Sequence, residues 1–255
     1  VHMAAVSTFG ASIHDPDTAW QVNLHGTRHV AESVLSSVPE ALFLHISTGE
    51  VYGRSCLIHD PVDESARLDP GSVYATTKAA ADLAIGELTG RGLRAIRLRP
   101  FNHTGKGQSE ALFVPAMAAQ IARAEAGLQE PVISVGNLEA RRDFLDVRDV
   151  VRAYANAIER SDSLSAGSVY NVASGIARRM GDILKALLSQ SRMPITVEPD
   201  ARRMRPSEVP LVRGDASAAR QDLSWEPQHR FEDTLEWILN DMRQHLHTQR
   251  DDRRI

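Results

Sequence analysis

The sequence predicts a doubly wound α/β fold, in which helices cover both faces of a mostly parallel sheet. Strand-like runs alternate with helix-like stretches over residues 1–100. The run ALFLHIST is apolar almost throughout, as expected for a strand that is buried on both faces. Two consecutive strand–helix–strand units of this kind require parallel strands joined by crossover helices.

Length and composition are those of a globular enzyme. The chain has 255 residues, 42% hydrophobic and 24% charged, with a net charge of -4. A slightly acidic chain has no general attraction for a nucleic-acid polyanion, and no apolar run approaches the roughly 20 residues that span a bilayer, so neither partner is expected. The single cysteine, Cys56, allows no disulfide and no cysteine-rich metal site, which favours a reducing, cytoplasmic compartment and no metal.

The first part of the chain supplies the two strand–helix–strand units. The opening VHMAAVS predicts an interior strand that runs into a small-residue turn. Apolar residues at helical spacing then predict a helix within 15–38, followed by the ALFLHIST strand. The next helix is expected within 71–92, ending at Gly90 or Gly92, and LRAIRLRPF predicts the strand after it.

The pattern changes after Pro100, where a second, smaller α/β domain is expected. It begins with a loop, 101–113, and an amphipathic helix, 114–127. An edge strand (132–137), a loop leading into a helix capped by Asp146 or Asp149, and a buried strand (167–174) follow. A helix, a strand and a last amphipathic helix complete the chain. The expected domains are 1–104 plus about 143–173, and 105–142 plus 174–255.

Tyr74 and Lys78 carry the first indication of chemistry. They are four residues apart on a predicted helix, so their side chains share one face. An ammonium beside a phenol stabilises the phenolate and makes the tyrosine a usable acid. Thr48 ends the preceding strand, where its hydroxyl can hydrogen-bond the same substrate oxygen. The three residues suit a ketone or alcohol that exchanges a hydride.

A structural interpretation of the same residues is that Tyr74 starts a helix, Lys78 is solvated, and Ser47 and Thr48 simply end a strand. The position of this hydroxyl pair favours catalysis, because ligands of open α/β sheets bind outside the carboxyl ends of the strands.

Five stretches in this order, HMAA, NLHGT, ISTGEVYG, YATTK and RPFNHTG, resemble the extended short-chain dehydrogenase/reductase family that acts on nucleotide-diphosphate sugars. The stretches RPFNHTGKGQ, VGNLEARRDFLDVRDVVRAY, RMRPSEVP and GDAS are most similar to its reductases of GDP-4-keto-6-deoxymannose. The resemblance implies a Rossmann-type sheet and NAD(P)H-dependent reduction of the 4-keto group, with GDP-D-rhamnose as the expected product. It also implies NADPH, with NADH as the alternative cofactor.

The resemblance assigns roles to individual residues. Thr48, Tyr74 and Lys78 would be the catalytic hydroxyl, acid and lysine, and Glu50 would lie beside the sugar. The diphosphate would be held at Asn102, Arg142 and Arg205, with Arg141 as an alternative to Arg142. His103 and Phe113 would line the sugar or base pocket. The cofactor site would comprise the residues Ala4, Ala5, Val6, Asn23, Tyr74, Lys78 and Phe101.

Gly49 distinguishes two reactions of this family. Dehydratases that resemble this segment place a polar residue after the threonine, because eliminating water needs an acid for the departing hydroxyl. Reduction needs only one proton donor, so Gly49 favours a reductase. The alternative interpretation is that Gly49 eases a tight backbone turn. A 4-epimerase, a dehydratase in which Glu50 is the base, and a non-catalytic nucleotide-sensing regulator remain open.

Two further expectations follow from the resemblance. A glycine-rich phosphate-binding turn is not found, so the N-terminal part of the Rossmann domain, roughly 60 residues, is expected to lie upstream of this chain. A homodimer through a four-helix bundle is expected from the helix over Thr27–Val38 and the helix of Tyr74. The latter carries Ala79, Ala80, Ala81 and Ala84, more small residues than one buried face requires.

Overall fold

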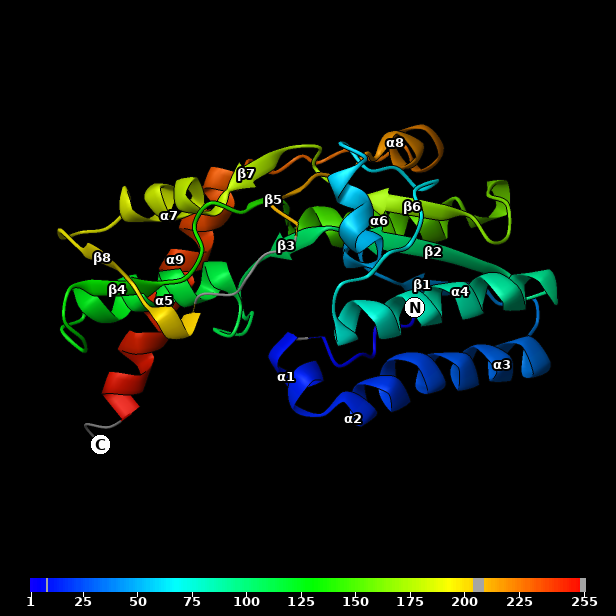
Figure 1. Ribbon diagram of the computed structural model, residues 1–255, viewed down its shortest axis with the longest axis horizontal. Helices are drawn as coiled ribbons and strands as arrows, with labels where there is room; N and C mark the ends of the chain where they lie inside the picture. Colours follow the sequence, from blue (N-terminus) through cyan, green and yellow to red (C-terminus); the bar gives the residue numbers. More distant parts are fainter. Residues whose placement is uncertain (8, 204–208, 253–255) are drawn as a thin grey trace.

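The computed structural model describes residues 1–7, 9–203 and 209–252 of the chain. Figure 1 shows two lobes that are connected by a narrower middle region. The first lobe contains β1 (Phe43–Ile46), β2 (Ala95–Pro100) and β6 (Val169–Val172), all parallel, in the order β1-β2-β6. This confirms the α/β class and the parallel sheet.

Helices cover both faces of the first sheet, as a doubly wound fold requires. On one side α3 (Thr27–Ser37) and α4 (Val73–Gly90) pack through Ala31, Ile85 and Leu88. On the other side α6 (Val147–Glu159) packs through Val150, Ala153 and Ala157 (Figure 1). The side chains of β1 are buried on both faces, which explains its continuous apolar sequence.

Local sequence accounts for the helix boundaries in this lobe. Ser72 caps α4 by accepting a hydrogen bond from Ala75 N–H, and Asp146 caps α6 by accepting one from Arg148 N–H. Between α2 (Pro16–Trp20) and α3 the helix widens into a π-helical segment, Gln21–Gly26. Such segments commonly occur at functional sites, and this one carries Asn23.

The N-terminal strand is shorter than expected. Only His2 pairs with the sheet, in a parallel bridge to His45, and residues 3–7 have no strand geometry. The prediction of a strand over VHMAAVS was therefore wrong beyond His2. Within the described residues, β1 is the only strand that pairs with the N-terminal segment. After His2 the segment leads to α1 (Phe9–His14), and the Val6 N–H donates to the Asn23 side-chain oxygen.

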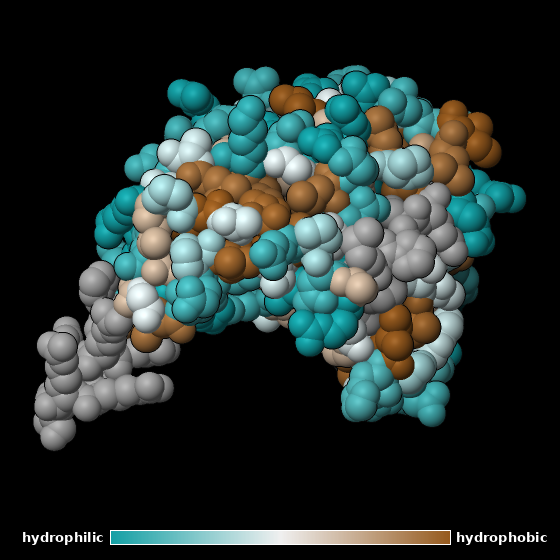
Figure 2. Space-filling model, turned by 60° about the vertical axis from the view of Figure 1, so that its left-hand side comes forward, coloured by the Kyte–Doolittle hydropathy of each residue, from teal (hydrophilic) through white to brown (hydrophobic). Residues whose placement is uncertain are grey.

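The second lobe has its own core. It contains the parallel pair β4 (Val132–Val135) and β8 (Thr196–Pro199) with α5 (Phe113–Glu125), α7 (Met180–Leu188) and α9 (Phe231–Asp252). Ile121, Ile133, Leu187 and Ile238 are completely buried between these elements. Figure 2 shows apolar residues gathered on one part of the face seen there, surrounded by polar ones.

The middle region contains a small mixed sheet that the sequence analysis missed. β3 (Asn102–Thr104) and β9 (Leu211–Val212) run parallel to β5 (Arg141–Asp146), and β7 (Ala177–Arg179) is antiparallel to it. Residues 102–104 and 141–146 were expected in loops. They are strands because they pair with each other, and their polar sequences give no period-2 signal.

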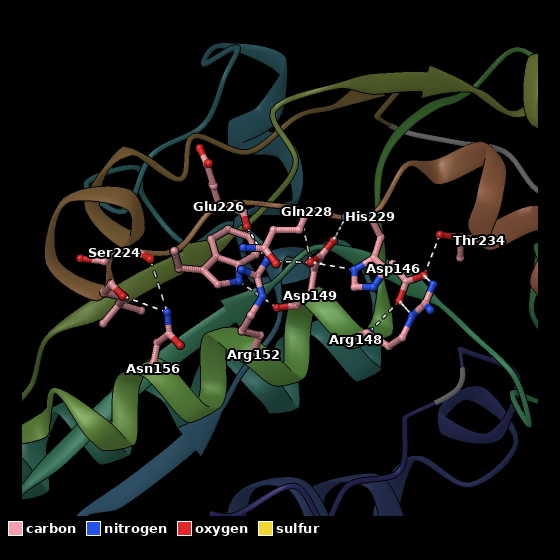
Figure 3. Close-up of polar contacts among 12 residues, drawn as sticks. Asp146, Arg148, Asp149, Arg152, Asn156, Ser224, Glu226, Gln228, His229 and Thr234 are labelled. Atoms are coloured by element: carbon pink, nitrogen blue, oxygen red, sulfur yellow. Dashed lines mark hydrogen bonds and ion pairs between the residues drawn. The ribbon is translucent and has the colours of Figure 1, made fainter.

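Two buried carboxylates join α6 to α9 and to the segment before it (Figure 3). Asp149 accepts hydrogen bonds from the backbone N–H groups of Gln228 and His229 and from Arg152. Asp146, which the sequence offered as the alternative cap, is the actual cap and also accepts from Thr234 Oγ1 at 2.7 Å.

One segment departs from the expected domain division. α8 (Ser217–Leu223) and Trp225 pack in the core of the first lobe, although 174–255 was assigned to the second domain. The reason is the indole of Trp225, which is buried and donates to the Asp149 carbonyl at 2.8 Å. The other boundaries stay a prediction.

Short helical turns complete the described chain: Gly49–Leu57 after β1, Ser161–Ser163 after α6, and Ala201–Arg203 after β8. None of the described helices is both long and apolar enough to cross a membrane.

Candidate active site

Thr48 and Tyr74 meet at the carboxyl end of β1. Thr48 caps the turn at Gly49–Leu57 by accepting from Glu50 N–H at 3.2 Å, which fixes its side chain just past the strand. Its hydroxyl is also hydrogen-bonded to Tyr74, at the start of α4. The structure therefore brings together two residues that are 26 positions apart, as the sequence analysis expected.

Tyr74 is a protonated acid in this structure. Burial raises the pKa of Tyr74 to about 12, the hydrogen bond with Thr48 lowers it, and the charge of Glu50 raises it. Lys78 is not among the groups that shift the pKa of Tyr74, and its Nζ donates to the Ile46 carbonyl at 2.5 Å. Tyr74 thus holds its proton at neutral pH, as a donor to a developing oxyanion must.

Lys78 lies behind Tyr74, one helical turn along α4. It is buried, and desolvation lowers its pKa to about 8, while the charge of Asp82 on the next turn raises it. Asp82 is itself completely buried and accepts hydrogen bonds from Arg97 and Arg99. Lys78 is therefore not a solvated surface residue.

The charges of Glu50 and Arg142 act on each other, and that of Glu50 also acts on Tyr74. Glu50 keeps exposed surface, yet protein atoms surround its carboxyl closely enough that desolvation raises its pKa, against the lowering effect of Arg142. Desolvation lowers the pKa of half-buried Arg142, against Glu50 and Cys56. Arg141, the alternative to Arg142, is exposed on the opposite face of β5.

The expected cofactor residues lie at the same edge of the sheet. Ala4 is exposed, and Ala5 and Val6 are half-buried. Asn23 is completely buried: its amide oxygen accepts from Val6 N–H at 2.7 Å, and its nitrogen donates to Val6 O and Thr77 Oγ1. Both amide hydrogens are therefore used inside the protein, and Asn23 holds the backbone of Val6 against α4.

The expected substrate residues are distributed along the middle sheet. Asn102 is half-buried on β3, opposite Phe144 of β5. His103 contacts the Phe101 carbonyl through Nδ1 at 2.9 Å, and burial lowers the pKa of its imidazole. Phe113 begins α5 and packs against the second core. Arg205 lies outside the described residues. No group of three potential metal-ligating side chains gathers within 1–7, 9–203 and 209–252.

Arg178 is a candidate that sequence reasoning missed. It stands directly opposite Arg142 in the β5–β7 register, so both side chains leave the same face of the sheet. Its guanidinium lies 4.6 Å from the centre of the Phe231 ring and donates to the Phe144 carbonyl. Desolvation lowers its pKa, against the charges of Glu232 and Asp143. Only the strand pairing reveals it.

Comparisons with known proteins give one consistent family. A family model described as GDP-mannose 4,6 dehydratase matches residues 1–238. GDP-6-deoxy-D-mannose reductase of Pseudomonas aeruginosa is 33% identical over 94% of this chain and 79% of its own length. GDP-mannose 4,6 dehydratase 2 of Arabidopsis thaliana is 26% identical over 94% of this chain and 64% of its own length.

Solved structures agree with this result. The structure of RMD from Pseudomonas aeruginosa complexed with NADPH has a TM-score of 0.89 and 31% identity, covering 96% of this chain and 80% of that one. A putative epimerase from Burkholderia cenocepacia has a TM-score of 0.81 and 33% identity, covering 95% and 74%.

Proposed function

This chain belongs to the family of GDP-mannose 4,6-dehydratases and related sugar-nucleotide enzymes, and within it we propose that the protein is an NAD(P)H-dependent reductase. Its substrate is a GDP-4-keto-6-deoxyhexose, whose 4-keto group it reduces, with GDP-D-rhamnose as the expected product. The observation that carries the proposal is the hydrogen-bonded pair of Thr48 and Tyr74 at the carboxyl end of β1, next to a residue that has no side chain. The 33% identity to a reductase supports it.

The protein side of the reaction needs one acid and one polarising group. Thr48 and Tyr74 donate hydrogen bonds towards the substrate carbonyl, and Tyr74 transfers its proton to the C4 oxygen. Because the pKa of Tyr74 is raised, that proton is present at neutral pH. Lys78, one helical turn behind Tyr74, carries a positive charge while it is protonated, and this charge belongs to the proposed cofactor site.

The residues present fit NADPH, which supplies the hydride to C4. Tyr74 and Lys78 share one face of α4, and the same helix is joined through Thr77 and Asn23 to the backbone of Val6. Tyr74, Lys78, Ala4, Ala5 and the Phe101 backbone are the residues that would hold the nicotinamide ribose. Asn23 acts as a positioning residue in this arrangement.

Arg142 and Arg178 would hold the diphosphate. Two guanidinium groups side by side on paired strands repel each other, and an anion between them removes that repulsion. Phe231 and Phe144 hold the Arg178 guanidinium, and Arg142 donates to the Arg141 carbonyl while the charge of Glu50 acts on it. Asn102, His103 and Phe113 complete the proposed substrate side, and Arg205 remains part of the proposal.

Three alternatives have different signatures. A 4-epimerase retains tightly bound NAD, which denaturing the purified protein would release. A dehydratase forms a 4-keto-6-deoxy product from GDP-mannose. A nucleotide-sensing regulator binds nucleotide without turnover, but such a protein has no need of a buried Thr48–Tyr74–Lys78 set.

Replacing Tyr74 by Phe tests the proposal. With GDP-4-keto-6-deoxymannose and NADPH, we expect turnover to fall by about 10² or more, while GDP-sugar and NADPH binding stay nearly unchanged. Tyr154→Phe is the matched control, since Tyr154 is a half-buried tyrosine near Tyr74. Turnover near that of the parent in Tyr74→Phe would exclude Tyr74 as the acid.

The proposal also includes a homodimeric assembly and a cytoplasmic location. A homodimer through α3 and α4 is supported by apolar side chains that remain exposed on both helices, including Val30 and Leu83. A cytoplasmic location is supported by the single, buried Cys56.

A further inference from the structure

We propose that Asp143 is a positioning residue: its carboxylate fixes the register of the middle sheet and thereby places Arg142 and Arg178 on one face, where they would hold the diphosphate. This inference rests on the proposed function, in which these two arginines bind the diphosphate. It deepens that function by naming the group that brings them together.

The strands on both sides of β5 do not fix their own register. β7 has three residues and β9 has two, and β7 has no alternation of apolar and polar residues. Two consecutive arginines occur on β5 and two on β7. Arg142 stands opposite Arg178, and the register also places Arg141 opposite Arg179. A slip of one residue in either direction would bring Ala177 or Arg179 opposite Arg142, with little change in the apolar pattern.

The Asp143 carboxylate holds both neighbouring strands near one end. It is completely buried. One oxygen accepts from the N–H and the hydroxyl of Ser174, at 2.8 and 2.6 Å. The other accepts from the N–H groups of Gly175 at 2.9 Å and Gly214 at 3.2 Å. Gly175 lies two residues before β7 and Gly214 two residues after β9, so one side chain holds the strands on both edges of β5.

The backbone that Asp143 binds has little freedom to shift. Gly175 has a φ of +77°, in the left-handed region that favours glycine. A Cβ atom added to Gly214 would lie 2.5 Å from the Cβ of Ala173, so the segments before β7 and after β9 also pack closely against each other. The four hydrogen bonds to Asp143 therefore select one register out of several that the strand sequences allow.

The selected register decides which arginines face the proposed substrate. Arg142 and Arg178 leave one face of the sheet. Arg179 leaves the other face, where it forms an ion pair with Glu139. If β7 slipped, Arg178 would leave its place, and Arg179 could replace it only by giving up this ion pair. Loss of the Asp143 carboxylate should therefore weaken diphosphate binding without changing either proposed ligand.

Disulfide formation tests the register without any ligand. Arg141→Cys combined with Arg179→Cys places two thiols directly opposite each other, close enough for a disulfide. We expect oxidation to join them, and Asp143→Asn to slow this reaction at least about 5-fold. Asp15→Asn is the matched control, because Asp15 also accepts from the N–H and the hydroxyl of one residue, Thr18, but at the start of α2. Equal rates in the Asp143→Asn and Asp15→Asn proteins would overturn the role of Asp143.

Ligand affinity tests the consequence for the site. Asp143→Asn should raise the Kd for GDP at least about 10-fold, since a charged hydrogen bond to the diphosphate is lost. The Kd for NADP⁺ should change by less than about 2-fold, and the two cysteines alone should leave GDP affinity unchanged. When Asp143→Asn is combined with the two cysteines and oxidised to completion, GDP affinity should return to within about 3-fold of the parent. A carboxylate that only stabilises the fold would not be rescued in this way.

Two further measurements complete the test. Ser174→Ala removes only the hydroxyl donor to Asp143, so it should change both the crosslinking rate and GDP affinity in the same direction by about 2- to 3-fold, even if Asp143→Asn does not fold. Equal losses of GDP and NADP⁺ affinity, or no recovery with the disulfide, would overturn the inference. A parent that binds no GDP would instead contradict the proposed function, and the crosslinking rates would still test the register.

Discussion

At the scale of single residues, the site depends on buried charges as much as on hydroxyl groups. Lys78 is surrounded by Asp82 on its own helix, His45 on β1 and His2 before β1. Desolvation lowers the pKa of Lys78 to about 8, and Asp82 raises it. The ammonium is thus present at neutral pH but is lost within a physiologically accessible range.

The pH profile should show this group. If catalysis needs the Lys78 ammonium, kcat/KM falls as pH rises through about 8. Asp82→Asn removes the charge that raises this pKa, so the alkaline limb should move to lower pH. Lys78→Arg keeps the positive charge at all accessible pH values, so the fall of kcat/KM near pH 8 should disappear. An alkaline limb at the same pH in all three proteins would exclude Lys78 as its cause.

Arg178 permits a matched comparison with its neighbour Arg179. A hydrogen bond to a charged group contributes about 1.5–3 kcal/mol, so Arg178→Met should raise the Kd for the GDP-sugar roughly 10- to 150-fold. NADPH affinity should not change. Arg179→Met is the control, because Arg179 is paired with Glu139. A lower Tm in Arg178→Met with unchanged GDP-sugar affinity would limit Arg178 to its contacts with Phe144 and Phe231.

At the scale of elements, the sequence predicts the helices and strands that have a periodic or continuous apolar pattern. It misses the strands that form only because they pair with another strand. The continuous apolar run of β1 and the capped, alanine-rich α4 are both recovered. β3 and β5 are missed because NHT and RRDFLD become strands only through their mutual register. Arg178 could not be found because its place opposite Arg142 depends on the β5–β7 register, whereas Thr48, Tyr74 and Lys78 follow from one strand end and one helix face.

The fold should lose stability when the Asp149 carboxylate, which connects α6 to the segment before α9, is replaced (Figure 3). Asp149 is completely buried; burial opposes its charge, but hydrogen bonds from His229, Gln228 and Arg152 hold its pKa below the ordinary value. Asp149→Asn should destabilise the fold by about 2–4 kcal/mol, because donors lose a charged acceptor.

The measurement is the free energy of unfolding by urea at neutral pH and at low pH. Because the pKa of Asp149 is lowered in the folded protein, its charge stabilises the fold fully above about pH 4, and this stabilisation is lost as pH falls through the folded pKa. The free energies of unfolding of the variant and the parent should therefore become equal at low pH. Asp162→Asn, whose side chain is 95% exposed, should change stability by less than about 0.5 kcal/mol. Equal effects of the two substitutions would contradict a structural role for Asp149.

At the scale of the whole molecule, the proposed self-association rests on apolar side chains that remain exposed on α3 and α4 and at the end of α3. Of the small residues that first suggested it, Ala79 and Ala81 are buried within the subunit, whereas Ala80 and Ala84 keep partial exposure. Instead Val30, Val38 and Leu83 are 44%, 53% and 60% exposed. A shallow, open depression lies on the surface of α3, lined by His29, Val30, Ser33, Val34, Ser37 and Val38.

A second copy of this surface is the partner that we expect. Because α3 and α4 pack side by side, a two-fold axis across them would form a four-helix bundle and bury the exposed valines and Leu83. Light scattering at micromolar concentration should give twice the mass of the chain. Val30→Glu combined with Leu83→Glu should give the monomer mass, since buried unpaired carboxylates oppose association. Ile58→Glu, at a position 80% exposed outside these helices, should leave the dimer intact. A parent that scatters as a monomer, or an Ile58→Glu variant that dissociates as readily as the double variant, would place the interface elsewhere or exclude it.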